Sequence, residues 1–521
     1  MTYIQKFKSE FLILLVFINL LVFTFAGYYY FGVKMSFYDD CFIYLHMASN
    51  IVESGSAQYF QPSGLINSQL LASSPMHLYF ETIAAAIVQI TNDNLRTLLS
   101  AKVILVLNGL LMSFFFSIFW KAKDFQYYLI VSIIFWLLVP TFDSMIEMEG
   151  GLLFFIFTAF AYRLYIFEST QKDYIVFGIL LGILMLSRIE IFTVAFIALS
   201  FLILLNKTKL DKTILVSIYA LLGVVTLHIV ISYILKVYPL PSTIWSKQVT
   251  GQIHLFDSHT FLEVLPSYIQ SFTGIQIKFL FLILSALTIL LCSRKVIISI
   301  GVFVALMLLV YHKLPANFTW YYQNAYLTIL MILMILSVQH LKNRRSYSLV
   351  FTFSSLILLI TLPIISKYYK DPGYEWDFNA KQSRAISYQY IAAHHLGNGI
   401  YKFPDFPPAY IRNPEIGMIA FFSGRTAWMY DMAGLAQIGN LNYPHCVGLE
   451  KVKTPSQAYK TPLQYFYPKK FQISGEEELK QLKPNSLVLD VWGVERNTNI
   501  DQALKNCFYF DGKICINKFR E

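Results

Sequence analysis

The stretch Phe37-Tyr38-Asp39-Asp40-Cys41-Phe42-Ile43-Tyr44 directly follows the first long apolar run of the chain, residues 11–31. That run is long enough to cross a bilayer, and we expect an uncleaved first transmembrane helix because no small-residue cleavage site follows it. Adjacent carboxylates disfavour each other's ionised form, which predicts a raised pKa for Asp39 or Asp40 and a base that works near neutral pH. A solvated loop edge is the alternative interpretation of this pair.

Composition places the chain among polytopic membrane proteins. Hydrophobic residues make up 56% of its 521 residues, charged residues only 14%, and the mean hydropathy is +0.53. A net charge of +10 could indicate nucleic acid, but Lys and Arg stand in short clusters between apolar runs. Such clusters are signals of membrane topology, so we expect contact with membrane lipid and no nucleic-acid partner.

About eleven segments are apolar and long enough to cross a bilayer. They are 11–31, 98–120, 126–141, 145–169, 174–187, 189–205, 213–236, 275–293, 296–311, 322–341 and 347–366. Basic clusters fall on alternate loops and mark these as cytoplasmic: Lys121/Lys123, Lys172, Lys207/Lys209/Lys212, Arg294/Lys295 and Lys342/Arg344/Arg345. The loop 32–97 and everything after residue 366 are then extracytoplasmic.

The segment 78–91 is apolar but short for a span, at about 14 residues with Glu81 inside it. If it crossed fully, the Asp39/Asp40 pair and the C-terminal part of the chain would fall on opposite sides. We therefore expect a re-entrant or interfacial helix.

From Lys370 onward the sequence is mixed and polar, with Pro, Gly and Asn throughout. It predicts a helix at 381–396, short strands at Pro414–Phe422 and Leu487–Val491, and a hairpin at Phe508–Ile516. We expect a transmembrane domain over 1–369 and a soluble extracytoplasmic α/β domain of about 150 residues over 370–521.

The five cysteines have no metal-ligand spacing: Cys41, Cys292, Cys446, Cys507 and Cys515. A two-residue turn at Asp511-Gly512 would pair residue 507 with residue 516 and put Cys507 and Cys515 on opposite faces. A disulfide between them needs a longer loop, and the sequence leaves it open.

Ionisable residues near membrane level are costly to insert, by about 2.5–3.5 kcal/mol each, and usually mark a pathway or a site. Here they gather on the outer side: Glu147, Glu149, Arg188, Glu190 and Lys247, together with the Asp pair. The structural alternatives are a solvated helix start for the first two, an internal ion pair for the next two, and a snorkelling lysine.

Carboxylates and cations at the outer membrane face suit a reaction in which a lipid-linked phosphate leaves. A cation stabilises the growing charge on the phosphate, and a carboxylate deprotonates an acceptor hydroxyl. The sequence contains no Walker-type or GxGxxG phosphate loop. The donor is therefore expected to be a lipid phosphate and not a nucleotide.

Several ordered motifs resemble the GT-C class of membrane glycosyltransferases, and within it the bacterial arabinofuranosyltransferase-like members that use polyprenyl-phosphate sugars. The segment Asp39–Tyr44 resembles the family's Asp-Asp-Ala-Tyr-Ile signature and is followed by an amphipathic stretch ending in Gly55. Ser73-Ser74-Pro75-Met76-His77 resembles its Thr-Ser-Pro-Leu-Trp segment, with His77 in place of the aromatic residue. Met148-Glu149-Gly150 and Ser187-Arg188-Ile189-Glu190 are similar to its Gly-Met-Glu and Thr-Arg-Pro-Glu.

Two later motifs extend the resemblance over most of the chain. Leu240–Lys247 is similar to the family's Leu-Pro-Asn-Thr-Phe-Tyr-Ala-Lys, and residues 415–435 resemble its Glu-Ile-Gly, Ser-Gly-Arg and Asp-Leu-Ala-Gly-Leu elements. The chain departs from the family in lacking Pro between Arg188 and Glu190 and in having Ser242 where the family has Asn. These departures put the identity of the sugar in doubt.

The resemblance implies a polytopic helical protein of the bacterial cytoplasmic membrane with its active site on the outer face. It implies transfer of a sugar, arabinofuranose in these members, from a polyprenyl phosphate to a glycan or protein hydroxyl. Asp39 would be the catalytic base, with Asp40 orienting the acceptor or binding a cation. The other expected site residues are Lys247 and Arg188 for the phosphate, Glu149 and Glu190 to orient the sugar or those cations, and His77 for a phosphate contact, with an interfacial histidine as the alternative.

Three questions stay open from the sequence. The sugar could be mannose or an aminosugar, the acceptor could be a protein, and Asp39 with Asp40 could hold a divalent cation although no further oxygen ligands complete such a site. A carrier of lipid-linked sugar is the alternative outside transfer chemistry. A carrier should show internal repeats and interrupted helices in corresponding halves, and the sequence shows neither.

Overall fold

The computed structural model describes part of the chain. The described residues are 39–57, 70, 72–121, 128, 131–132, 135–136, 144–165, 170–189, 191–193, 196–197, 212–237, 239–241, 409–413, 417–424, 427–431, 487–493, 507–510 and 514–518. The chain divides into two compact units. Unit 1 comprises 1–35, 106–228 and 259–375, and unit 2 comprises 36–105, 229–258 and 376–521.

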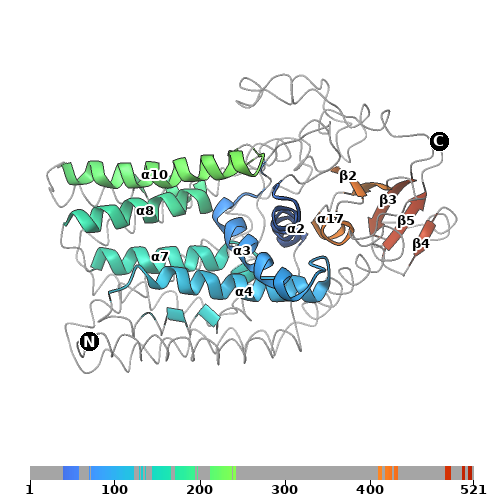
Figure 1. The fold of residues 1–521 in the computed structure, drawn as a ribbon, viewed down its shortest axis with the longest axis horizontal. Coiled ribbons are helices and arrows are strands. Elements are labelled where there is room, and N and C mark those ends of the chain that lie inside the picture. The colour runs from blue at the N-terminus through green and yellow to red at the C-terminus, as the bar shows by residue number, and fades with distance from the viewer. Residues whose placement is uncertain are drawn as a thin grey trace, which may run out of the picture. The chain divides into compact units, whose positions relative to one another are not determined.

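Unit 2 is built around helix α2 (Asp39–Ser54), which begins at the carboxylate pair and ends before Gly55. Gly55 has a positive φ of 67° and donates from its backbone N–H to the carbonyl of Ile51, which closes the helix. Side chains from Cys41 to Asn50 are buried on every face of this helix. A helix buried all round needs partners on both sides, and α2 has them in α3 (Pro75–Thr91) and α17 (Gly417–Ser423) (Figure 1).

The C-terminal part of unit 2 contains a five-stranded mixed sheet. Its strands are β1 (Ala409–Asn413), β2 (Ala427–Asp431), β3 (Leu487–Gly493), β4 (Cys507–Phe510) and β5 (Ile514–Lys518), in the order β2-β1-β3-β5-β4. β1 pairs in parallel with β2 and β3, whereas β5 is antiparallel to β3 and β4. Parallel neighbours need a crossover, and α17 supplies it between β1 and β2. The predicted strand at Leu487–Val491 and the predicted hairpin are confirmed.

The predicted strand at Pro414–Phe422 is wrong. The described residues of that region, from Gly417 onward, belong to helix α17, which follows β1 and precedes β2 in the chain. Buried Met418, Phe421 and Phe422 follow the i, i+3, i+4 spacing of one helix face. A short apolar run does not distinguish a buried strand from a buried helix, which explains the error.

The register of the C-terminal hairpin differs from that of a two-residue turn. Cys507 pairs with Asn517 and Cys515 pairs with Phe510, with an irregularity between Cys507 and Tyr509. The strands therefore leave three residues between Phe510 and Ile514, and the two cysteines are not cross-strand partners.

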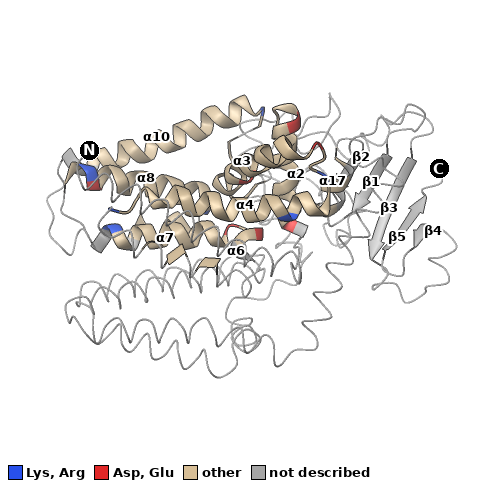
Figure 2. Ribbon diagram, turned by 60° about the horizontal axis from the view of Figure 1, so that its bottom comes forward, with Lys and Arg blue, Asp and Glu red and all other residues tan. Residues whose placement is uncertain are grey.

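Unit 1 contains α6 (Ser144–Glu147), α7 (Gly150–Tyr165) and α8 (Gln171–Ser187). Two longer helices, α4 (Leu98–Ser117) and α10 (Lys212–Ile234), begin in one unit and end in the other. α7 packs against α8, and α8 approaches α10 closely at Gly178 (Figure 1). The middle of each of these long helices is almost free of charge (Figure 2).

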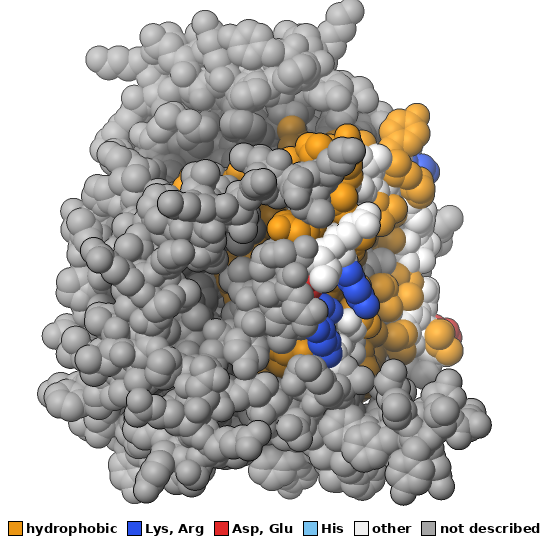
Figure 3. Space-filling view, turned by 90° about the vertical axis from the view of Figure 1, so that its left-hand side faces the viewer, with side chains coloured by type: hydrophobic (Ala, Val, Ile, Leu, Met, Phe, Trp, Pro, Cys, Tyr) orange, Lys and Arg blue, Asp and Glu red, His pale blue; other side chains and the backbone are white. Residues whose placement is uncertain are grey.

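Within the described residues, two helices are long and apolar enough to cross a membrane, Leu98–Ser117 and Leu215–Ile234. The second exposes large hydrophobic side chains such as Leu227 and Tyr233, and hydrophobic side chains make up much of the described surface in Figure 3. These helices match the predicted spans at 98–120 and 213–236, α7 lies within the span at 145–169, and α8 begins three residues before the span at 174–187 and ends with it. The remaining predicted spans, and the helix predicted at 381–396, lie wholly or mostly outside the described residues.

Candidate functional site

The carboxylate pair lies at the start of α2. Asp39 is the first residue of the helix, and Asp40, the second, is half-buried. The first turn of a helix has unsatisfied backbone N–H groups and the positive end of the helix dipole, which stabilise nearby carboxylates. The motif Asp39–Tyr44 thus combines a polar helix start with an apolar body, because the residues after Asp40 are buried.

The body of this motif holds the helix in place. The ring of Phe42 packs against Phe421 and Phe422 of α17, with centroid distances of 5.3 and 5.5 Å. On α3's side, the hydroxyl of Tyr44 lies 2.7 Å from Ser73 Oγ and accepts a hydrogen bond from the backbone N–H of Ser74. The start of α2 is therefore fixed between two elements that are distant in sequence.

The Ser74-Pro75 motif builds the N-terminus of α3. Ser74 is the N-cap, its Oγ accepts a hydrogen bond from the backbone N–H of His77, and Pro75 occupies the first helical turn. Proline is favoured there because its missing N–H would have no helical partner. The Ser74-Pro75 motif therefore has a local structural role at the start of α3.

His77 lies fully buried beside Glu81, one turn further along α3. Nε2 of His77 is 3.1 Å from Oε1 of Glu81, and the His77 ring meets the ring of Tyr44 edge to face. Burial raises the pKa of the Glu81 carboxyl, and the neighbouring His77 opposes this rise. Within the described part of the chain, Nδ1 of His77 and Oε2 of Glu81 have no hydrogen-bond partner.

Unit 1 brings together two of the predicted site residues. Arg188 and Glu149 form a buried ion pair in which the arginine is 5% exposed and the glutamate is fully buried. Arg188 is the C-cap of α8 with an extended backbone, and Glu149 directly precedes α7. A cation suits the negative end of α8 and an anion suits the positive end of α7, so both helix dipoles favour the pair.

The structure shows Glu149 as a partner of Arg188, and the internal pair of Arg188 with Glu190 that the sequence left open stays a prediction. Glu190 and Lys247 both lie outside the described residues. Glu147, the last residue of α6, is buried like Glu149. The solvated helix start considered for these two glutamates is therefore wrong within unit 1.

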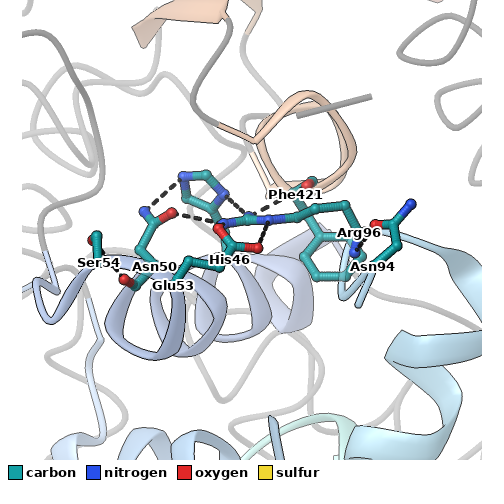
Figure 4. A network of polar contacts seen from close by, with 7 residues as sticks. All are labelled: His46, Asn50, Glu53, Ser54, Asn94, Arg96 and Phe421. Carbon is teal, nitrogen blue, oxygen red and sulfur yellow. Dashed lines mark hydrogen bonds and ion pairs between the residues drawn. The ribbon is translucent and has the colours of Figure 1, made fainter. Parts of the chain in front are cut away.

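A cluster around Arg96 was not predicted from the sequence (Figure 4). The Arg96 side chain is 1% exposed and donates to both carboxylate oxygens of Glu53, at 3.1 Å from Nε and 2.6 Å from Nη2. It also donates to His46 Nδ1, Asn50 Oδ1 and the carbonyl of Phe421. Spacing carried a partial signal, because His46, Asn50 and Glu53 lie at i, i+4 and i+7 on α2, but nothing in the sequence linked them to Arg96.

No metal-binding group is evident among the residues that the structure describes: no three His, Cys, Asp or Glu side chains gather there. The divalent-cation site expected at Asp39 and Asp40 stays a prediction.

Comparisons with known proteins identify a fold. No family model matches the chain, and no curated protein matches it in sequence. Among solved structures, the chain is similar to ArnT from Cupriavidus metallidurans bound to undecaprenyl phosphate, with a TM-score of 0.52 and 10% identity over 98% of each chain. A likeness at this identity shows the fold alone. The chain therefore shares the fold of this ArnT structure over almost its whole length.

Proposed function

We propose that this protein is a membrane glycosyltransferase that moves a sugar from a polyprenyl phosphate to a hydroxyl group at the outer face of the bacterial cytoplasmic membrane. The observation that carries the proposal is the likeness, over 98% of both chains, to ArnT, whose structure holds undecaprenyl phosphate. The ordered sequence motifs support it independently. They contain the carboxylates at the start of α2 and Arg188 at the end of α8.

Transfer requires a base for the acceptor. In the proposed reaction the acceptor oxygen forms a bond to the anomeric carbon of the sugar, and the bond from that carbon to the phosphate oxygen breaks. The electron pair of the broken bond leaves with the polyprenyl phosphate, and the acceptor proton passes to Asp39. Asp40 orients the acceptor hydroxyl or, with Asp39, holds a divalent cation.

The leaving phosphate needs positive charge. Arg188 and Lys247 supply it in the proposal, because a guanidinium and an ammonium stabilise the charge that grows on the phosphate oxygens. Glu149 orients Arg188 through the buried ion pair. Glu190 and His77 complete the expected set, toward the sugar and the phosphate respectively.

The sugar of the proposal is arabinofuranose, on the resemblance of the motifs to the arabinofuranosyltransferase-like members. Mannose and aminosugars on the same lipid carrier are the competing donors, and the acceptor is a cell-envelope glycan or a protein hydroxyl. The two domains of the proposal are the transmembrane part over 1–369 and the outer domain over 370–521.

The test is transfer by purified protein in lipid nanodiscs, with a panel of polyprenyl-phosphate sugars that includes arabinofuranose, mannose and an aminosugar. Release of free polyprenyl phosphate and labelling of an envelope glycan are measured together. We expect one donor to react, with release of polyprenyl phosphate and labelling of the glycan increasing together. Movement of intact lipid-linked sugar between leaflets without release of polyprenyl phosphate would instead establish a carrier.

A further inference from the structure

We propose that Arg96 is a positioning residue that ties helix α2, and with it the Asp39/Asp40 pair, to helix α17 of the C-terminal domain. The proposal rests on the proposed function as far as catalysis is concerned. Its structural part stands on contacts within unit 2 alone. It makes the outer domain part of the machinery that holds the catalytic base.

The contacts of Arg96 join two distant parts of the chain. Its guanidinium donates to His46, Asn50 and Glu53 of α2, while Nη1 also lies 3.3 Å from the carbonyl oxygen of Phe421 in α17 (Figure 4). The guanidinium carbon is 5.7 Å from the centre of the Phe421 ring, within range of a cation–π interaction. One side chain thus satisfies acceptors separated by more than 300 positions in sequence.

The position of Arg96 is itself fixed. Its backbone N–H donates to Asn94 Oδ1, and Asn94 donates to Asn92 Oδ1, so the segment between α3 and α4 is held by side-chain turns. Asn92 also donates to Ser100 Oγ at the start of α4. The guanidinium therefore reaches α2 from a loop between α3 and α4 whose conformation is fixed by side-chain hydrogen bonds.

The geometry requires arginine. Two nitrogens contact the two oxygens of Glu53 while Nη1 and Nη2 remain available to His46, Asn50 and Phe421. A lysine ammonium has three donors on a flexible stem and cannot present this planar fork. At 1% exposure, a lost contact at this site is not replaced by bulk water.

The cluster continues the helix face that begins at the carboxylate pair. Asp39, His46 and Glu53 are spaced seven residues apart, which is about two helical turns, so these positions share one face of α2. The ring of Phe42, one turn from the pair, packs on the same Phe421 whose carbonyl contacts Arg96. A shift of α17 would therefore act on α2 both near its start, through Phe42, and further along, through Arg96.

The structural test is hydrogen–deuterium exchange of the full-length protein in nanodiscs, read on amides of residues 41–54 and 417–424. Arg96→Lys retains the charge and removes the fork, and Phe421→Leu retains the carbonyl and removes the ring contacts. Asp93→Asn is the matched control, since Asp93 is exposed in the same loop. We expect Arg96→Lys to increase exchange in both segments together by about tenfold, from the loss of charge-assisted hydrogen bonds, and Asp93→Asn to change neither. Exchange unchanged in both segments overturns the proposal.

The functional test separates positioning from general loss of fold. Per folded molecule, Arg96→Lys should lower kcat by about 100-fold, the cost of a misplaced reacting group, with KM for the lipid donor almost unchanged. If Arg96→Lys increases hydrogen–deuterium exchange in α2 while kcat stays normal, the positioning role of Arg96 is overturned. If wild type transfers no sugar at all, the proposed function fails, and the exchange measurement still decides whether Arg96 ties the two helices.

Discussion

Arg188 at the C-terminal end of α8 and Glu149 ahead of α7 form a buried ion pair within unit 1. The two residues are separated by two helices in sequence and meet because the helices run back alongside each other. Such a pair can hold a cation ready for a phosphate, and it can also be purely structural. Variants that change the pair as a whole separate these two roles.

Glu149→Gln removes the carboxylate that neutralises the buried Arg188. We expect a loss of about 3–5 kcal/mol in the free energy of unfolding, because the buried guanidinium loses the carboxylate of its ion pair. The double variant Glu149→Leu/Arg188→Met should recover most of that stability and remain inactive. Thermal unfolding in detergent and sugar transfer measure the two effects, and an active double variant contradicts the role of Arg188 toward the phosphate.

Gly178 permits the close approach of α8 and α10. A Cβ on this residue would lie 2.1 Å from the backbone oxygen of Ser217. We therefore expect Gly178→Ala to destabilise the protein by about 1–3 kcal/mol through overpacking. Gly223→Ala in α10 is the control, since nothing in the described structure lies within 4 Å of its added methyl group. Equal melting temperatures for the two variants would show that this contact between the helices is absent.

Tyr44→Phe removes the hydroxyl that contacts Ser73 and accepts from the Ser74 N–H. The buried N–H of Ser74 loses this partner, at a cost of about 1–3 kcal/mol. Tyr219→Phe, at an exposed position of α10, should leave stability unchanged. Denaturant unfolding compares the two, and proteolysis between α2 and α3 should become faster only in the Tyr44 variant.

Glu81 makes stability depend on pH. Burial raises its pKa above the ordinary 4.5, so the folded protein binds a proton that the unfolded chain releases. This contribution to stability is fully present below pH 4.5 and is lost as pH rises through the raised pKa. We expect Glu81→Gln to be more stable than wild type at pH 8. Its free energy of unfolding should also depend less on pH above pH 4.5. Parallel profiles of the two proteins from pH 4.5 to 8 would contradict the buried, protonated carboxyl.

Sequence patterns were sufficient for elements with strong periodicity or clear ends. The apolar runs at 98–120 and 213–236 each predicted a helix with nearly correct ends, whereas the stretch from Asp39 to Gly55 was described only as a motif followed by an amphipathic stretch and is helix α2. The run containing Phe421 and Phe422 misled because seven residues suit a strand or a helix equally, and the neighbouring strands decide between them.

The sequence did not show which residues distant along the chain contact each other. The resemblance placed Glu149 and Glu190 toward the sugar or the cations without saying which residue contacts Arg188, and in unit 1 Glu149 does so across the packed helices. Arg96 stood alone in a polar loop, and its acceptors come from α2 and α17. Such contacts depend on how helices pack, which is set by the whole core and not by a local pattern.

In the proposed reaction, the carboxylate pair at the start of α2 deprotonates the acceptor. The most direct measurement is single-turnover transfer from the reactive lipid-linked sugar by Asp39→Asn, with Asp93→Asn as the matched amide control in the same unit. Loss of one general base predicts a rate lower by about 100- to 10,000-fold for Asp39→Asn, with donor binding retained. A rate equal to that of Asp93→Asn would contradict the claim and place the base elsewhere.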